Sequence, residues 1–402
     1  MKFALRRNLI YPFQLIIWNW LRNLEVLLIN YLFNFGSSLI YSPLMFLGEF
    51  ILGLFFYSYQ MNFLKVKKSP SARFMSIELI ETDNEMNIHD SKIKIYFLLF
   101  IASFLDYVGF MIASAFIPNF INISQSIVFR LSCILTITDA LLYYYILKLP
   151  IFRHQFFSLI ITSICLIIVI ITEYFFQDFN STLSLKDFSI VLLLNILCEV
   201  FGALIDVIEK YLFEYNFFNP FLALELEGMF GFVLSFLCFI FPNYGKDIIK
   251  VYNNNSIGNN FLFTFLLSLY IILSGSKNTF RVVTTKLYSP MARGLTDYFL
   301  NPFYLTLSYI IKIDFFTKGE QNILYFLINL ILSIIISFCG CVFNEFIILF
   351  FCNLEHDTHH QIVQRSDKDN LTDIDSSSDA DIKSELKGIE KELLIIDSHI
   401  AQ

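Results

Sequence analysis

Residues 188–213 read FSIVLLLNILCEVFGALIDVIEKYLF, an apolar segment that carries polar or small side chains at regular intervals. The segment is longer than the roughly 20 apolar residues that an α-helix needs to cross a bilayer. Five positions follow one another at spacings of four, three, four and three residues, namely Asn195, Glu199, Gly202, Asp206 and Glu209. At about 100° per residue they share one face of a helix. We therefore predict a membrane helix with a single wetted stripe.

The composition of the whole chain also indicates a membrane protein. Hydrophobic residues make up 56% of the 402 residues and charged residues only 16%, whereas soluble domains average about 45–50% and about 25%. The net charge of −7 comes from residues 353–402, which contain twelve acidic and five basic residues. This acidity belongs to a tail and gives no support for nucleic-acid binding.

The apolar segments predict an all-α integral membrane protein with about ten transmembrane helices. Nine is the alternative count, because Arg22 and Glu25 interrupt the first segment. The segments are 9–33, 38–60, 94–114, 119–146, 154–176, 188–213, 221–243, 261–280, 290–311 and 322–352.

The distribution of Lys and Arg predicts the orientation of these helices, since positive charges favour the cytosolic side. The asymmetry places both termini in the cytosol, and it assigns Arg281, Lys286 and Arg293 to one cytosolic connection. Residues 64–93 form a polar cytosolic linker in this scheme. Residues 353–402 form a cytosolic acidic tail, whose low hydrophobicity is typical of a mostly disordered segment.

Charged residues inside the predicted helices are costly in lipid and usually face a bundle interior or a water-filled path. Glu227 lies about 10 Å along its helix from Pro220, at 1.5 Å per residue, and Gly231 beside it would allow a close helix contact. Glu225 falls on a different face, near the headgroups. Glu227 is therefore the stronger candidate for a functional carboxylate.

Arg130 is the arginine placed most deeply in a predicted span, and it needs a carboxylate partner because an unpaired buried charge would be costlier. Asp106, Glu199, Asp206 and Glu227 are the candidate partners. A structural ion pair and the binding of an anionic substrate remain two open interpretations of Arg130. A further polar face consists of Ser274, Asn278 and Arg281.

Several motifs, in this order along the chain, resemble the drug/metabolite transporter superfamily (EamA-like), and in particular the F branch of solute carrier family 35. They are SPLMFLGEFILGLFFY (42–57), the third span with Asp106, the fourth with Ser124-Gln125 and Arg130, EKYLFEYNFFNPFLALELEGMFGF (209–232) and SPMARGLTDYFLNPF (289–303). The resemblance implies two inverted five-helix repeats, residues 1–176 and 188–352, around a central cavity that opens alternately to each side.

The resemblance also implies which residues line that cavity. The matching positions are Glu49, Gln125, Arg130, Glu209-Lys210, Glu227-Gly228 with Gly231, and the pair Arg293 and Asp297. Two departures from the family pattern are the charged first span and the Asn301-Pro302 dipeptide, because a proline there should break the ninth helix. From the stripe, the interior charges and the resemblance together, the candidates for the transport pathway are Glu49, Asp106, Gln125, Arg130, Asn195, Glu199, Asp206, Glu227, Asn278, Arg293 and Asp297.

These features predict a secondary active transporter or exchanger of a small polar metabolite, with nucleotide sugars and nucleotide-like solutes among the candidates. We expect a multi-pass protein of an endomembrane (Golgi, endoplasmic reticulum, lysosome or vacuole). The chain contains no GxxxxGK[ST], GxSxG or HExxH motif, so we expect no enzymatic activity, no cofactor and no metal site. The substrate and the coupling ion or exchange mode stay open.

A second function class remains open, namely a non-transporting membrane scaffold or accessory subunit with a transporter-like fold. Its intramembrane charges would then be internal ion pairs. The expected partners are a small-molecule substrate and the lipid bilayer, and no nucleic acid. A homodimer is left open, as is a cytosolic sorting adaptor that binds the acidic dileucine pattern of residues 390–395 in the tail.

Overall fold

The computed structural model of this chain describes most of the predicted membrane segments. The described residues are 3–5, 10–33, 38–62, 92–113, 134–148, 151–177, 185–236, 246–254, 256–287, 323–349 and the single positions 299, 302, 306, 354 and 358. The predicted linker, nearly all of the predicted tail, the first part of the fourth segment and most of the ninth lie outside these residues.

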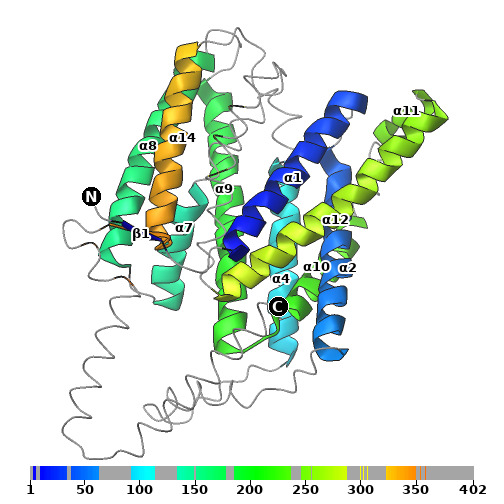
Figure 1. The fold of residues 1–402 in the computed structure, drawn as a ribbon, viewed down its shortest axis with the longest axis horizontal. Coiled ribbons are helices and arrows are strands. Elements are labelled where there is room, and N and C mark those ends of the chain that lie inside the picture. Colours follow the sequence, from blue (N-terminus) through cyan, green and yellow to red (C-terminus); the bar gives the residue numbers. More distant parts are fainter. Residues whose placement is uncertain are drawn as a thin grey trace, which may run out of the picture.

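The described chain is all-α apart from two short strands (Figure 1). The helices are α1 (Ile10–Phe33), α2 (Tyr41–Asn62), α4 (Lys92–Met111), α7 (Ile134–Leu142), α8 (Arg153–Gln177), α9 (Leu185–Lys210), α10 (Pro220–Phe236), α11 (Lys246–Asn254), α12 (Ile257–Leu287) and α14 (Ile323–Phe343). Shorter helical turns precede α2 at Ser38–Ile40, follow α7 at Tyr143–Leu147 and follow α9 at Tyr211–Tyr215.

Six of the described helices are long and apolar enough to cross a membrane, as in a multi-pass membrane protein. They lie in α2, α4, α8, α9 with the turn that follows it, α12 and α14. Helices suit lipid because they satisfy their backbone hydrogen bonds internally. α1 is not among the six, in line with the charges that interrupt its sequence, and α10 has only 17 residues.

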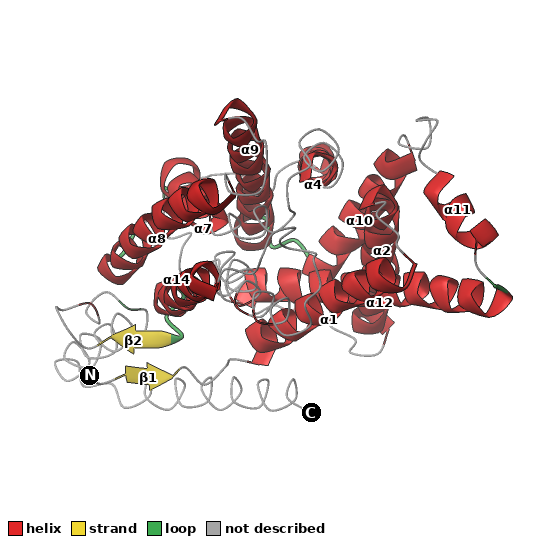
Figure 2. Cartoon of the chain, turned by 90° about the horizontal axis from the view of Figure 1, so that it is seen from above, coloured by secondary structure: helices red, strands yellow, loops and turns green. Residues whose placement is uncertain are grey.

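The helices pack in two groups with α9 between them (Figures 1 and 2). In the larger group α2 packs against both α10 and α12, α1 packs against α12, and α4 packs against α10. In the smaller group α8 packs against α14. α9 contacts α4 on one side and α7 on the other, so it joins the two groups.

Glycines bring the helices of the larger group into backbone contact. A Cβ added at Gly48 of α2 would overlap the carbonyl oxygen of Ile271 in α12, and one at Gly275 would overlap the carbonyl oxygen of Gly48. On the opposite side of α2, a Cβ at Gly228 of α10 would overlap the backbone of Phe50. Small residues of this kind allow the close packing on which membrane helices depend.

The two strands join the N-terminal segment to the end of the last helix. β1 (Phe3–Leu5) pairs antiparallel with β2 (Ile347–Leu349), and Ala4 lies opposite Ile348. Beside β2, Glu345 lies 3.5 Å from the buried His154 at the start of α8. The N-terminal segment, the start of α8 and the end of α14 therefore meet at one end of the bundle.

Two helix boundaries differ from those predicted from hydropathy. α12 runs from Ile257 to Leu287 and is longer at both ends than the predicted segment 261–280. The last helix stops at Phe343, and the chain then turns into β2 instead of continuing as a helix to residue 352. Hydropathy alone gives both boundaries wrongly. A helix can continue through polar residues when these are buried, as α12 does. The last helix ends where the chain leaves its helical hydrogen bonds and pairs with β1 instead.

Candidate functional site

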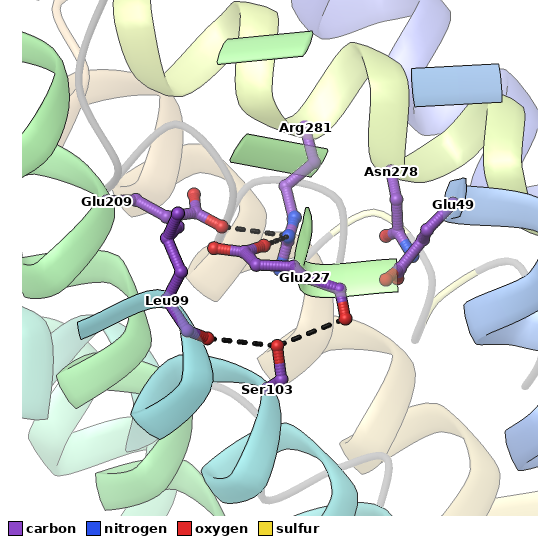
Figure 3. Close-up of polar contacts among 7 residues, drawn as sticks. All are labelled: Glu49, Leu99, Ser103, Glu209, Glu227, Asn278 and Arg281. Atoms are coloured by element: carbon purple, nitrogen blue, oxygen red, sulfur yellow. Dashed lines mark hydrogen bonds and ion pairs between the residues drawn. The ribbon is translucent and has the colours of Figure 1, made fainter. Parts of the chain in front are cut away.

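The centre of the larger helix group contains an arginine held between two carboxylates (Figure 3). The Nη2 atom of Arg281 lies 2.8 Å from Oε1 of Glu209 and 3.1 Å from Oε2 of Glu227. All three side chains are buried, and Glu209 is completely enclosed at 0% exposure. Both carboxylates contact the same nitrogen, so the guanidinium ties α9, α10 and α12 together at one point.

The three helices bring these side chains to the same depth. Glu227 lies seven residues after Pro220, where α10 begins, and Arg281 lies six residues before Leu287, where α12 ends. At 1.5 Å per residue, both are about 10 Å from the ends of their helices. Glu209 is six residues from Tyr215, the end of the turn that continues α9. The triad is therefore well inside the bundle.

The position of Glu227 depends on how α10 begins. The side-chain oxygen of Asn219 accepts hydrogen bonds from the backbone N–H groups of Phe221 (2.9 Å) and Leu222 (3.3 Å), as an N-cap does. Pro220 follows at the first helical position, where its missing N–H costs nothing. Asn219 also donates to Gln60 at the end of α2 (2.7 Å), which fixes α10 against α2.

A second carboxylate contact lies beside the triad. Asn278, three residues before Arg281 on α12, donates a side-chain hydrogen bond to Glu49 of α2. Glu49 is 1% exposed and Asn278 is 3% exposed. Figure 3 shows this pair next to Arg281 and Glu227, so that α2, α9, α10 and α12 each supply a charged or amide group to one cluster.

A hydroxyl group joins α4 to the same cluster. The Oγ atom of Ser103 lies 3.0 Å from the backbone oxygen of Glu227 and 3.0 Å from that of Leu99. Asp106, one turn further along α4, interacts electrostatically with both Glu49 and Glu227. We call Glu49, Glu209, Glu227, Asn278 and Arg281 the central cluster.

The central cluster contains three carboxylates and one guanidinium, so its formal charge is negative when all groups are ionised. Lys277 also interacts electrostatically with Glu49 and offsets part of that charge. A single ionised side chain at the centre of a lipid-exposed helix costs roughly 2.5–3.5 kcal/mol on insertion scales. Burial of these groups together is tolerable because Arg281 offsets part of the negative charge and Asn278 donates a hydrogen bond to Glu49. Removal of Arg281 would therefore increase the uncompensated negative charge.

The polar stripe predicted on residues 188–213 lies inside the molecule over much of its length. Asn195, Asp206 and Glu209 are buried, and Glu199 and Gly202 are half-buried. Glu209 is completely buried against Arg281, so it is not a solvated helix end. The stripe extends away from the central cluster along α9 toward the contact with α7.

The structure brings some of the predicted pathway residues together and leaves others apart. Glu49, Asn278 and Glu227 belong to the central cluster, and Asp106 is close enough to interact with it. Asn195, Glu199 and Asp206 lie along α9. Gln125, Arg130, Arg293 and Asp297 lie outside the described residues, and among the described basic residues the one beside Glu227 is Arg281.

Sequence reasoning missed three buried charged residues. Arg281 was noticed on a polar face but assigned to a cytosolic connection, whereas it is 2% exposed inside α12. Its spacing of three residues from Asn278 was the available signal. Asp139 on α7 is fully buried beside α9 and was not singled out, although it stands in the otherwise uncharged run ILTITDALL. Glu25 on α1 was treated only as an interruption of a weak span, and it is buried as well.

No protein family and no curated protein matches the chain. The resemblance to the drug/metabolite transporters therefore remains a hypothesis that rests on the quoted motifs.

Proposed function

We propose that the protein is a secondary transporter or exchanger that moves a small polar metabolite across a membrane by alternating access. The observation that carries the proposal is the central cluster, in which buried charged and amide groups from α2, α9, α10 and α12 meet inside an apolar bundle. Intramembrane charges are expensive, and those that persist usually line substrate or ion pathways. The endomembrane location is part of the proposal.

The pattern of helix contacts supports a two-repeat architecture. If the first to fifth helices correspond to the sixth to tenth, then α1 corresponds to α9, α2 to α10, α4 to α12 and α8 to α14. Under this correspondence, the contact between α1 and α12 is equivalent to the contact between α9 and α4. The contact between α2 and α12 is likewise equivalent to the contact between α10 and α4. The contact between α2 and α10 and the contact between α8 and α14 each join two corresponding helices, so each is equivalent to itself.

This pairing is what an inverted repeat around a pseudo-two-fold axis requires. Two smaller contacts of α12, with α9 and with α10, have no equivalent contact of comparable extent among the described helices. They involve the helix that contributes Arg281 and Asn278, so the departure from symmetry coincides with the central cluster. In an alternating-access transporter, asymmetry between the repeats is what distinguishes one open state from the other.

The rival function, a scaffold with a transporter-like fold, also accounts for internal ion pairs such as that of Arg281 with Glu209 and Glu227. The two functions differ in whether water reaches the stripe on α9. A dry structural core keeps both Gly202 and Asp206 away from solvent in every state, whereas a transport path exposes them at least transiently.

Thiol labelling separates the two functions. Gly202→Cys and Asp206→Cys are made in a background that lacks the native cysteines, with Val233→Cys, whose native side chain is 61% exposed on the apolar outer surface, as the lipid-facing control. A membrane-impermeant polar maleimide should label positions 202 and 206 faster than position 233. If the maleimide labels neither position 202 nor position 206, from either side of the membrane, the result would favour the scaffold.

A further inference from the structure

A buried carboxylate outside the central cluster has no hydrogen-bond partner. Glu25, in the middle of α1, is 5% exposed, and neither of its carboxylate oxygens accepts a hydrogen bond from the part of the chain that the structure describes. Burying a polar group without a hydrogen bond costs about 1–3 kcal/mol by protein mutagenesis, and a charged one costs more. Orphaned groups of this kind call for a specific explanation, such as a bound ion or ligand.

Aromatic contacts fix the register of α1 against α12 and so place Glu25. Trp18 stacks on Phe280 with ring centroids 6.4 Å apart, and Phe33 contacts Phe263 at 5.0 Å. The numbers rise along α1 as they fall along α12, so the helices run antiparallel. Glu25, which lies between Trp18 and Phe33, is therefore level with the part of α12 around Tyr270 and Ser274.

Two tyrosines, one on α12 and one on α2, interact with Glu25. Tyr270 of α12 and Tyr41 of α2 are buried, and their rings meet at a tilt with centroids 4.8 Å apart. Both interact electrostatically with Glu25. We call Glu25, Tyr41 and Tyr270 the Glu25 pocket. A carboxylate with aromatic side chains near it is a combination that binds ammonium groups, through charge and cation–π attraction.

The charged and titratable groups that face Glu25 leave its negative charge incompletely balanced. They are Arg22 on α1, Tyr41 on α2 and Tyr270 on α12. Arg22 is one turn away, but its Nη2 atom lies 3.4 Å from the side-chain oxygen of Asn23, and neither oxygen of Glu25 accepts a hydrogen bond from it. A positive charge inside the pocket would supply what the described chain does not.

The Glu25 pocket is continuous with the central cluster. Tyr270, Ser274, Asn278 and Arg281 follow one another on α12 at spacings of four, four and three residues, so they share one helix face, and all four are buried. Tyr270 interacts electrostatically with Glu49, a member of the central cluster. A polar face thus extends about 16 Å along α12, from the pocket to Arg281.

We propose that the Glu25 pocket binds one monovalent positive charge, either a proton on the carboxylate or the ammonium group of an organic cation. The inference rests on the proposed function for its role, because the bound charge would be the coupling ion or part of the transported solute. It also narrows the substrate class, since the three carboxylates of the central cluster likewise favour a positive ligand over an anionic one such as a nucleotide sugar.

The two tryptophans of the chain provide a direct test, because Trp18 and Trp20 both lie on α1 within two helical turns of Glu25. The purified full-length protein in detergent is titrated with acid, and separately with tetramethylammonium chloride against sodium chloride at equal ionic strength. We expect a saturable change in tryptophan emission with at least one of them. A change in tryptophan emission with acid alone indicates a proton site, whereas a change with tetramethylammonium indicates an organic-cation site.

Two variants make the test specific. Glu25→Gln should raise the half-saturating concentration at least tenfold or abolish the response, whereas Glu214→Gln, which changes an exposed glutamate in the turn that follows α9, should leave it unchanged. A Glu25→Gln protein that titrates like the native protein would overturn the proposal, as would a native protein with no saturable response. If Glu25→Gln does not fold, Tyr270→Leu, which removes the aromatic ring, replaces it and should weaken the response several-fold.

The outcome can be separated from that of the proposed function. A saturable, Glu25-dependent response in a protein that exchanges no solute across proteoliposome membranes would support the pocket and refute the transporter. Solute exchange by a protein whose tryptophan emission responds to neither protons nor tetramethylammonium would refute the pocket and support the transporter.

Discussion

Arg281 is the residue on which the packing of the central cluster depends. Its guanidinium contacts both Glu209 and Glu227, so it supplies a counter-charge to each carboxylate. Breaking a buried ion pair by removing one partner is strongly destabilising, whereas replacing the whole pair by neutral groups is often tolerated. Arg281 and its two carboxylates should therefore behave as a unit in mutagenesis.

We predict that Arg281→Gln destabilises the protein by about 3–5 kcal/mol, because it removes the guanidinium that contacts two buried carboxylates. Thermal unfolding of the purified protein measures the change in Tm. The triple variant Glu209→Gln/Arg281→Gln/Glu227→Gln is the matched control, since it removes all three charges and should recover much of the lost stability. A triple variant that is less stable than Arg281→Gln would show that the three residues do not form one unit.

For single residues, the sequence predicted the environment of the buried carboxylates better than that of their partner Arg281. Glu227 and the stripe from Asn195 to Glu209 were predicted as interior groups because helical periodicity places them on definite faces. Arg281 was assigned to the wrong environment, because hydropathy cannot locate the end of a helix whose last two turns contain buried polar residues. Periodicity also cannot show which helices meet, so the contact of Glu49 with Asn278 was not predictable.

The packing of α2 illustrates how elements are held together. One side of this helix meets α12 at Gly48 and Gly275, and the other meets α10 at Gly228 and Gly231. The sequence predicted that Gly231 would permit a close contact, and the ring of Phe46 indeed lies where its Cβ would be. In lipid, helix association relies on close van der Waals packing, so these contacts carry much of the stability of the larger group.

Gly48→Val should therefore lower Tm and the yield of monodisperse protein, because the added side chain meets the backbone of α12, which cannot move aside as a flexible side chain could. Overpacking of a close interface typically costs about 1–3 kcal/mol. Gly258→Val is the matched control on α12, since a Cβ there has no neighbour within 4 Å. Equal effects of the two substitutions would contradict the described contact between α2 and α12.

At the scale of the whole molecule, the described helices form two groups joined by α9, with the N-terminal segment attached to the end of the smaller group. The approximate positions of eight of the ten predicted spans agree with described helices, because long apolar segments are the most reliable signal that a sequence contains. The association of β1 with β2 was not foreseen. Three-residue strands far apart in the chain have no periodicity from which to recognise them.

The strand pairing predicts that the N-terminal segment and the end of the last helix lie on the same side of the membrane. In a background without native cysteines, Ala4→Cys/Ile348→Cys should form a disulfide on mild oxidation, since these positions are opposite each other in the sheet. The out-of-register control Ala4→Cys/Phe346→Cys should cross-link much less. Comparable cross-linking of both pairs, or of neither, would contradict the register.

Solute counterflow tests the central claim, that this bundle transports a small polar metabolite. Purified protein is reconstituted into proteoliposomes preloaded with nucleotide sugars, nucleotides or small amines, and entry of the matching radiolabelled solute is measured. We predict saturable counterflow for at least one class, with amines favoured, and at least a tenfold loss in Glu227→Gln relative to the exposed-site control Glu214→Gln. Absence of counterflow for every class, from native protein that is folded and correctly reconstituted, would contradict the account.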